Sequence, residues 1–444
     1  MASVEPYGRT LTPAADPTAR QVALDLIGGV LRRKRPLDDA IEDHSAMGEL
    51  SVRDRAFARL LVATVLRRLG QIDALIADCL NTPLAPRAAV IHDILRLGIS
   101  QLLFLRTPPH AAVATSVDLA HARGFLTHKG LVNAVLRRLS VEGPGRVERQ
   151  DAARLNTPEW LWRSWAQAYG EECARAIGVA HLKEAPLDLT LRGDDDEWCE
   201  KLQATKLPTG SLRRPAGGSV TALPGYAEGA WWIQDAAASL PVRLFDGIGG
   251  QAVVDLCAAP GGKTAQLASA GAQVTAIDRS TRRLDRLVAN LNRLGLPVSA
   301  IAADALSWRP EEPVDAVLLD APCTATGAIR RHPDVPHLKQ PEDVARLAVV
   351  QENLLHAAVD MLRPGGMLVY CTCSLEPEEG PQRVEALLRS GAPMQRRPIE
   401  ADKLGAPPDW VTPGGDLRTL PCHLSEFDGV DGFYAARLVK VANA

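Results

Sequence analysis

From Gln251 to the C-terminus, strand-like and helix-like segments alternate, and this alternation limits the possible folds more than any other feature of the chain. Strands are expected at 252–257, 273–278, 298–302, 315–319, 367–371 and 432–439, and helices at 264–270, 282–294, 341–362 and 381–390. Alternating strands and helices build a mostly parallel sheet with helices on both faces. We therefore expect a doubly wound α/β domain over residues 236–444.

The first third of the chain has a different pattern. Between Thr18 and Leu139 apolar residues recur at helical spacing, and no strand-like alternation is present. This pattern predicts an all-α bundle over residues 18–142. Residues 1–17 are rich in Pro and Ala and are expected to form a disordered tail, and the polar stretch 141–151 is expected to be a linker. Residues 151–235 combine helical segments with the alternating run 187–191, which predicts linker helices and a small α/β subdomain.

Composition restricts the class of protein. No apolar run reaches the roughly 18 residues that a membrane span needs, and the N-terminus has no secretory h-region. Eight cysteines in 444 residues do not form a disulfide scaffold, so we expect a reduced, cytoplasmic protein. The net charge is −3, yet residues 1–140 hold 18 Lys and Arg against 13 Asp and Glu. This basic front is suited to a phosphate-rich partner, although an exposed charged surface would give the same count.

The segment Asp255–Lys263 places a Gly-rich turn between a strand and a helix, as nucleotide-binding proteins do. A Walker A loop would need glycine at position 257, where Cys257 stands, and the G-x-G-x-x-G dinucleotide fingerprint is absent. Neither phosphate-binding pattern fits. S-adenosylmethionine, which has no phosphate, remains as the candidate cofactor.

Three acids stand where consecutive strands end. Asp278 is placed to bind a ribose, Asp304 to reach adenine, and Asp320 to lie near the sulfonium. Each could instead cap the following helix. Carboxyl ends of parallel strands meet at one edge of a sheet, so three acids in register favour a cofactor site.

Two cysteines follow strands in this half of the chain. Cys323 lies in Asp320-Ala321-Pro322-Cys323, and Cys373 in Cys371-Thr372-Cys373-Ser374. They could be buried structural residues or, with Cys257 and Cys371, zinc ligands, but there is no CxxC pair or grouped His, so no metal is expected. Thiols beside a cofactor cleft favour covalent chemistry: a thiolate that adds to carbon 6 of a pyrimidine activates carbon 5 for methylation, and Asp320 could steady ring nitrogen 3.

These motifs resemble the Nop2/Sun family of RNA cytosine carbon-5 methyltransferases, and within it the bacterial small-subunit ribosomal RNA enzymes of the Sun/Fmu type. The resemblance also includes Asn290–Gly295 and Arg330–Asp334. It implies that Cys373 is the nucleophile and that Cys323 assists product release. It further implies an S-adenosylmethionine site lined by Cys257, Ala258, Ala259, Pro260, Gly261, Gly262, Lys263, Asp278, Asp304 and Asp320, with Arg283 as a further contact. Cys371 departs from the family, which usually has a small residue without a thiol there.

The helical N-terminal region is similar to the NusB RNA-binding fold through Asp54–Phe57, Leu66–Leu69, Gln101–Leu105, Pro108–Val113 and Val132–Arg138. This resemblance implies 16S ribosomal RNA as the partner, bound before the subunit is fully assembled. The alternatives are a non-catalytic ribosome-assembly factor that binds RNA, methylation of a different RNA, and methylation of an exocyclic nitrogen. The last class shows an Asn/Asp-Pro-Pro-aromatic motif, which is replaced here by Asp320–Cys323. Oligomeric state is not indicated.

Overall fold

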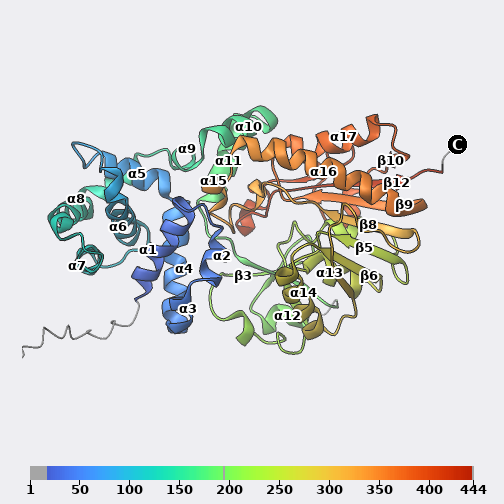
Figure 1. Ribbon diagram of the computed structural model, residues 1–444, viewed down its shortest axis with the longest axis horizontal. Coiled ribbons are helices and arrows are strands. Elements are labelled where there is room, and N and C mark those ends of the chain that lie inside the picture. Colours follow the sequence, from blue (N-terminus) through green and yellow to red (C-terminus); the bar gives the residue numbers. More distant parts are fainter. Residues whose placement is uncertain (1–17, 194–195, 443–444) are drawn as a thin grey trace, which may run out of the picture. The chain divides into compact units, whose positions relative to one another are not determined.

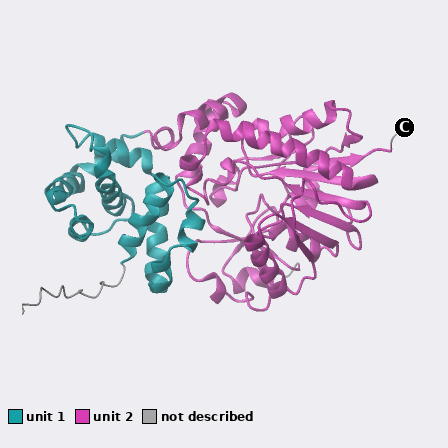
Figure 2. Cartoon of the chain, viewed as in Figure 1, with its two compact units in different colours: residues 1–150 teal, residues 151–444 magenta. Residues whose placement is uncertain are grey.

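A computed structural model describes residues 18–193 and 196–442. The chain divides into two compact units, residues 1–150 and 151–444 (Figure 2). The tail expected at 1–17 lies outside the described residues. Within the described part of the chain, no helix has both the length and the apolarity to cross a membrane.

Unit 1 is built entirely of helices where it is described. They are α1 (Ala19–Leu31), α2 (Leu37–Glu42), α3 (Ser45–Glu49), α4 (Val52–Arg67), α5 (Leu69–Ala77), α6 (Ala89–Ile99), α7 (Pro109–Ala122) and α8 (Lys129–Glu148), with a π-helical turn at Ser100–Phe104. Thr18 begins α1 through a capping box, in which Gln21 N donates to Thr18 Oγ1 and Thr18 N donates to Gln21 Oε1. Fully buried Ile27, Leu61, Ile94 and Leu136 from four helices form the core. The prediction of an all-α bundle is confirmed.

The linker expected at 141–151 is wrong, because α8 continues through Pro144 to Glu148. A proline removes one helical hydrogen bond and usually ends a helix. Tertiary contacts oppose this ending. A Cβ at Gly143 would lie 2.7 Å from Leu103 Cδ2, so the helix packs closely at this point. Gln150, just beyond the helix, donates to the carbonyl of Gln71 and accepts from its side chain.

Unit 2 begins with three helices and a small antiparallel sheet. The helices are α9 (Ala152–Asn156), α10 (Glu159–Tyr169) and α11 (Glu171–His181). The sheet has the order β2-β3-β1-β4 and comprises β1 (Leu187–Leu191), β2 (Thr205–Lys206), β3 (Leu212–Arg214) and β4 (Trp231–Ile233), with α12 at Glu197–Lys201. Leu189, Leu212 and Trp231 are buried between these elements.

The large sheet has the order β10-β12-β9-β8-β5-β6-β7, and β11 pairs with β12. Its strands are β5 (Ala252–Leu256), β6 (Gln273–Asp278), β7 (Ser299–Ala302), β8 (Val314–Asp320), β9 (Leu362–Thr372), β10 (Met394–Arg396), β11 (Leu417–Thr419) and β12 (Phe433–Lys440). Strands β5 to β9 are mutually parallel, and β12 runs antiparallel to β9. The strand order reverses between β5 and β8. In doubly wound sheets, ligands bind beyond the carboxyl ends of the strands at such a switch point.

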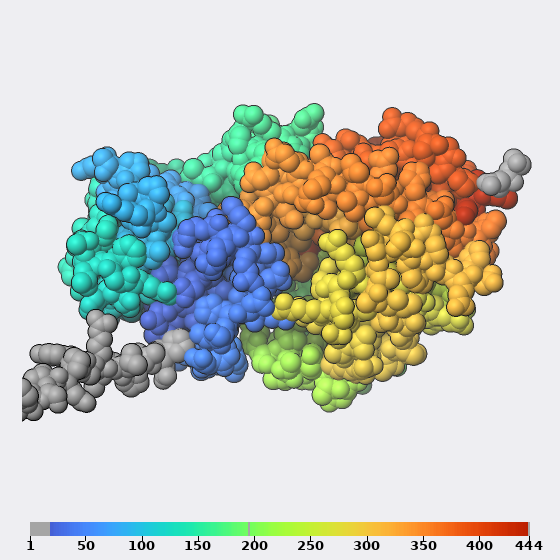
Figure 3. Space-filling view, in the orientation of Figure 1, coloured from blue at the N-terminus to red at the C-terminus, as the bar shows by residue number. Residues whose placement is uncertain are grey.

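Helices cover both faces of this sheet (Figure 1). They are α13 (Gly262–Ser269), α14 (Thr281–Leu294), α16 (Pro341–Met361), α17 (Pro381–Arg389) and α18 (Ala401–Leu404), whereas α15 (Val335–Leu338) packs with α10 and α11. On one face, Leu354, Leu355 and Leu387 of α16 and α17 pack against buried strand residues. On the other, Leu284 and Leu287 of α14 pack with Ala276 of β6. In the space-filling view the side chains of α16 and α17 close into a continuous surface (Figure 3). The doubly wound prediction is confirmed.

Candidate active site

The Gly-rich turn after β5 needs glycine at one position in particular. Gly261 precedes α13 with φ of +103°, a left-handed conformation that disfavours side chains. A Cβ there would also lie 2.7 Å from Leu287 Cγ. The backbone N–H groups at the start of α13 are therefore presented without any side chain at position 261.

Asp278 holds this turn in place. Its Oδ2 accepts from the backbone N of Ala259 at 3.1 Å, and its Oδ1 accepts from the N of Ser280 at 2.9 Å. The side chain is 3% exposed, and Arg283 approaches its Oδ2 at 3.9 Å while also donating to the carbonyl of Ala259. Asp278 thus shapes the turn that precedes α13, in addition to any contact with a ligand.

The other two strand-end acids are more accessible. Asp304, after β7, is exposed and accepts from the backbone N of Leu306 in a turn, and it caps no helix because the next element is β8. Asp320, at the end of β8, has a side chain that is 33% exposed. With Asp278, these residues supply carboxylate oxygens at the carboxyl ends of β6, β7 and β8. Such a set of acceptors suits hydroxyls, amino groups and positive charge better than it suits phosphate.

Lys263 projects from the first turn of α13 toward Asp320. Its Nζ donates to Asp320 Oδ2 at 2.7 Å and lies 4.7 Å from the ring centroid of Phe433. Burial acts to lower the pKa of this lysine, but the Asp320 carboxylate outweighs it and raises the pKa. Lys263 therefore remains a buried cation bound to a carboxylate.

The two predicted thiols meet at this edge of the sheet. Cys323, after β8, and Cys373, after β9, are half-buried, and their sulfurs are 3.5 Å apart. The hydrogen bond to Cys373 and burial raise the pKa of Cys323 well above its ordinary value. Cys371 is fully buried, and its thiol donates to Asp320 Oδ1 at 3.6 Å. Asp320 therefore lies between Lys263 and Cys371.

Two cations, Lys263 and Arg331, interact electrostatically with Cys373. Arg331 donates to Asp431 Oδ2 through two nitrogens, at 2.8 and 2.5 Å. Its side chain is 38% exposed, and the Asp431 carboxylate raises its pKa. Each of the two cations is therefore paired with a carboxylate, Lys263 with Asp320 and Arg331 with Asp431.

Next to Arg331 a buried network joins distant parts of unit 2. Arg330 is 1% exposed and donates to Asp235 at 3.3 Å and to the carbonyl of Asp428 at 2.7 Å. Asp235 also accepts from the backbone N of Asp431. The run Arg330-Arg331 is therefore held by buried acids, since Arg330 donates to Asp235 and Arg331 donates to Asp431.

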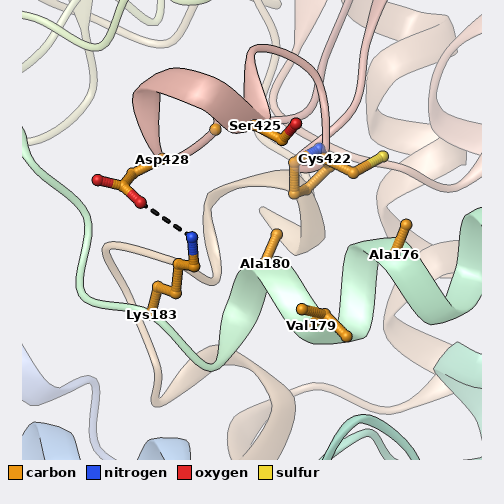
Figure 4. A pocket seen from close by; sticks show the side chains of 9 residues that line it. Ala176, Val179, Ala180, Lys183, Cys422, Ser425 and Asp428 are labelled. Atoms are coloured by element: carbon orange, nitrogen blue, oxygen red, sulfur yellow. Dashed lines mark hydrogen bonds and ion pairs between the residues drawn. The ribbon is translucent and has the colours of Figure 1, made fainter.

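Near this network, a pocket of about 290 Å³ separates α11 from the segment that precedes β12 (Figure 4). Ala176, Val179 and Ala180 line one side and Cys422 the other. The ion pair between Lys183 and Asp428, 2.9 Å long, lies at one end. Its lining is largely apolar, and it contains none of the predicted site residues.

Sequence patterns did not indicate several residues of this site. The sequence predicts only that Phe433 lies in the strand 432–439, and Asp431 belongs to no recognised motif. Glu379 and Gln351, which hold the loop around Cys323, were likewise missed. These residues are distant from the motifs in sequence and meet them only in the folded chain, so no sequence spacing predicts their position in the site. Among the described residues, no group of three His, Cys, Asp or Glu side chains is arranged to hold a metal.

The C-terminal half matches the family model of 16S rRNA methyltransferase RsmB/F over residues 244–439, and residues 16–140 match the NusB family. The chain is 34% identical over 442 residues to ribosomal RNA small subunit methyltransferase B of Klebsiella pneumoniae, covering 96% of this chain and 98% of that protein. It is 36% identical to the protein of the same name in Pseudomonas syringae, over 95% and 97% of the two chains.

Two solved structures share the fold. The protein PH0851 aligns over 94% of this chain and 98% of its own length, with a TM-score of 0.75 and 22% identity. A methyltransferase homolog protein from Pyrococcus horikoshii aligns over 66% and 98%, with a TM-score of 0.54 and 25% identity. The near full-length match to curated relatives above 30% identity carries the assignment: this chain belongs to the RsmB/F family of 16S rRNA methyltransferases, with a NusB-family region at its N-terminus.

Proposed function

We propose that the protein transfers a methyl group from S-adenosylmethionine to carbon 5 of a cytosine in 16S ribosomal RNA, through a transient bond between Cys373 and the base. The observation that carries this proposal is that the Cys323 and Cys373 sulfurs lie 3.5 Å apart at the carboxyl edge of the sheet, the edge at which β8 ends in Asp320. The names of the curated relatives supply the substrate, small-subunit ribosomal RNA.

The strand-end acids fit S-adenosylmethionine. When bound, this cofactor supplies an electrophilic methyl group on a sulfonium. Asp278 and Asp304 would accept hydrogen bonds from its ribose and adenine, and residues 257–263 would line the site with backbone groups. The acceptor-rich edge and the absence of a phosphate-binding pattern both favour a cationic ligand without phosphate.

The electrostatics distinguish the two thiols. Adjacent sulfurs do not readily ionise together, because the two negative charges repel. The raised pKa of Cys323 keeps that thiol protonated. This supports Cys373 as the nucleophile and Cys323 as the residue that assists release.

The chain's own residues then act in sequence. The Cys373 thiolate forms a bond to carbon 6 of the cytosine, and the displaced electron pair moves to ring nitrogen 3. This nitrogen takes up a proton from water and shares it with the Asp320 carboxylate. Carbon 5 thereby becomes nucleophilic and takes the methyl group. A base next removes the carbon-5 proton, the sulfur–carbon bond breaks, and Cys373 leaves as a thiolate. Cys323, 3.5 Å from the leaving sulfur, is placed to assist this last step.

The target base must leave its stack to reach these thiols, which favours RNA that is not yet fully assembled into a subunit. We assign RNA binding to the helical region 18–142 and RNA recognition to 151–235, with catalysis in 236–444. We place the reaction in the cytoplasm, where ribosomal RNA is available and thiols stay reduced.

Substitution of the two cysteines tests this mechanism. Cys373→Ser should abolish methyl transfer to protein-free 16S ribosomal RNA, because a hydroxyl is a far weaker nucleophile than a thiolate. Cys323→Ala should instead accumulate an RNA–protein adduct that survives denaturing electrophoresis. Nucleoside mass spectrometry identifies the methylated position. Full activity of Cys373→Ser, or methylation of a nitrogen, would refute the proposal.

A further inference from the structure

Both peptide groups next to Cys323 are held by hydrogen bonds from other elements. On one side the carbonyl of Pro322 accepts from Gln351 Nε2, in α16, at 2.9 Å. On the other side the backbone N of Thr324 donates to Glu379 Oε1 and Oε2 at 3.0 and 3.2 Å. Gln351 Nε2 also donates to Glu379 Oε1 at 3.1 Å. Cys323 is therefore fixed from both sides by one pair of buried side chains.

Glu379 is fully buried, and the donors that surround it are neutral amides and hydroxyls. Burial raises its pKa, while the hydrogen bonds from Ser374, Thr324 and Gln351 oppose that rise. An ionised carboxylate only accepts hydrogen bonds, so it matches a shell made of donors. An uncharged amide in its place would direct an NH₂ group toward one of them.

The same network reaches the second thiol. Thr324 Oγ1 donates to Glu379 and lies 3.2 Å from Ser374 Oγ, next to Cys373. The carbonyl of Cys373 accepts from the backbone N of Gly327 at 2.9 Å. Tyr370, three residues before Cys373 on β9, donates to the carbonyl of Glu379 at 2.6 Å. Glu379 thus connects the Cys323 loop, the Cys373 loop and α16.

We propose that Glu379, together with Gln351, is a positioning residue that sets the distance between the Cys323 and Cys373 sulfurs and thereby the rate of product release. This inference rests on the proposed function, in which Cys323 assists release. Glu379 and Gln351 hold the backbone of residues 322–324 by hydrogen bonds, and the charge of Glu379 also contributes to the raised pKa of Cys323. If the loss of these hydrogen bonds displaces the Cys323 sulfur by about 1 Å, the catalysed step can slow by up to about 100-fold.

Glu379→Gln is the first test, with Glu378→Gln as the matched control, since Glu378 is the exposed neighbour. In Glu379→Gln, kcat should fall by about 10- to 100-fold while KM for RNA stays within about twofold. The fraction of enzyme held as RNA adduct at steady state should rise. Glu378→Gln should match the wild type in all three measurements. A wild-type kcat and adduct fraction in Glu379→Gln would overturn the inference.

A second measurement does not depend on methylation. Diamide oxidises two neighbouring thiols to a disulfide and takes up their two hydrogens as a hydrazine, and mass spectrometry follows the Cys323–Cys373 disulfide. Its formation should be at least several-fold slower in Glu379→Gln than in Glu378→Gln. If Cys323→Ala traps no adduct, the release role fails, yet slower disulfide formation would still support positioning. Equal rates would refute it.

Gln351→Met covers the case in which Glu379→Gln does not fold. Methionine keeps the side-chain length but removes both donors, to Pro322 O and to Glu379. The same slower disulfide formation and raised adduct fraction are expected, with circular dichroism to verify folding. If Gln351→Met folds and has the wild-type rate of disulfide formation and the wild-type adduct fraction, the result would count against the inference.

Discussion

Both compact units carry exposed ion pairs, but unit 2 also holds pairs in which both side chains are almost fully buried. In unit 1, the side chains of the Arg59–Asp38 pair are 57% and 59% exposed, and those of Arg138–Glu142 are 47% and 45% exposed. In unit 2, Arg330 and Asp235 are 1% and 2% exposed. The Arg213–Asp188 pair, at 7% and 2%, is similar.

This difference separates two uses of arginine that the sequence does not distinguish. An exposed pair contributes about 0–1 kcal/mol to stability and leaves its cation available to a polyanion. A buried pair fixes backbone segments in space, and removal of one partner leaves an uncompensated charge. The positive excess of residues 1–140 is therefore available for the RNA binding proposed for this region, whereas arginines of unit 2 such as Arg330 fix the backbone near the candidate site.

The division has exceptions within unit 1. Asp93 is fully buried between Arg32 and Arg96. Arg68, one of the basic residues of the NusB-like region, stacks over Phe104 with its guanidinium carbon 5.2 Å from the ring centroid, and burial lowers its pKa. Arg137 and Arg138 of α8 remain exposed. They are the stronger candidates for phosphate contacts.

Arg330→Met should give the largest effect. Loss of the cation leaves Asp235 buried without its ion-pair partner and leaves Asp431 paired with Arg331 alone, and the expected loss is about 3–5 kcal/mol of unfolding free energy. Urea denaturation measures it. Arg138→Met is the control in unit 1 and should change stability by less than about 1 kcal/mol. Similar losses in the two variants would break the comparison between the units.

Asp255→Asn addresses a buried acid without a cationic partner. Burial raises the pKa of Asp255 from 3.8 to about 7, and Thr264 donates to its Oδ2 at 2.6 Å. Because the native pKa lies above the unfolded value, the native state binds more protons between pH 4 and 7. The stability from this group is present at low pH and is lost as the pH rises through about 7.

Wild type should therefore lose about 2 kcal/mol more stability than Asp255→Asn between pH 5 and 7. Denaturation at a series of pH values measures the difference, and identical pH profiles would show that Asp255 is ionised throughout. Glu376, whose pKa burial also raises to about 7, contributes equally to both proteins and cancels.

Joint substitution of Arg137 and Arg138 by Ala should have the smallest effect on folding, within about 0.5 kcal/mol. Affinity for ribosomal RNA should fall several-fold, and the slope of log affinity against log salt should decrease by about 1.4, since each phosphate contact contributes about 0.7. Filter binding at several salt concentrations provides both values. An unchanged slope would mean that neither Arg137 nor Arg138 contacts a phosphate, and another basic residue of unit 1 would be the next to test.

Local patterns predicted much of the fold. The strand at 273–278 was placed correctly, and the helices at 264–270, 282–294, 341–362 and 381–390 were found within two residues at each end. The short strands β10 and β11 were missed, because three residues give too little alternation to be recognised. The predicted linker at 141–151 ended helix α8 too early. The helix continues through Gly143-Pro144-Gly145 because it packs against Leu103, and no local pattern indicates that contact.

What the sequence determined by itself was the order of elements, the Gly-rich turn and the residue types at strand ends, because backbone periodicity and turn chemistry are local. The tertiary structure alone decided which of these residues meet. It brought Lys263 to Asp320, placed the two sulfurs 3.5 Å apart, and enclosed Glu379 with donors from separate elements. Those contacts depend on how distant strands lie side by side in the sheet, which no local spacing encodes.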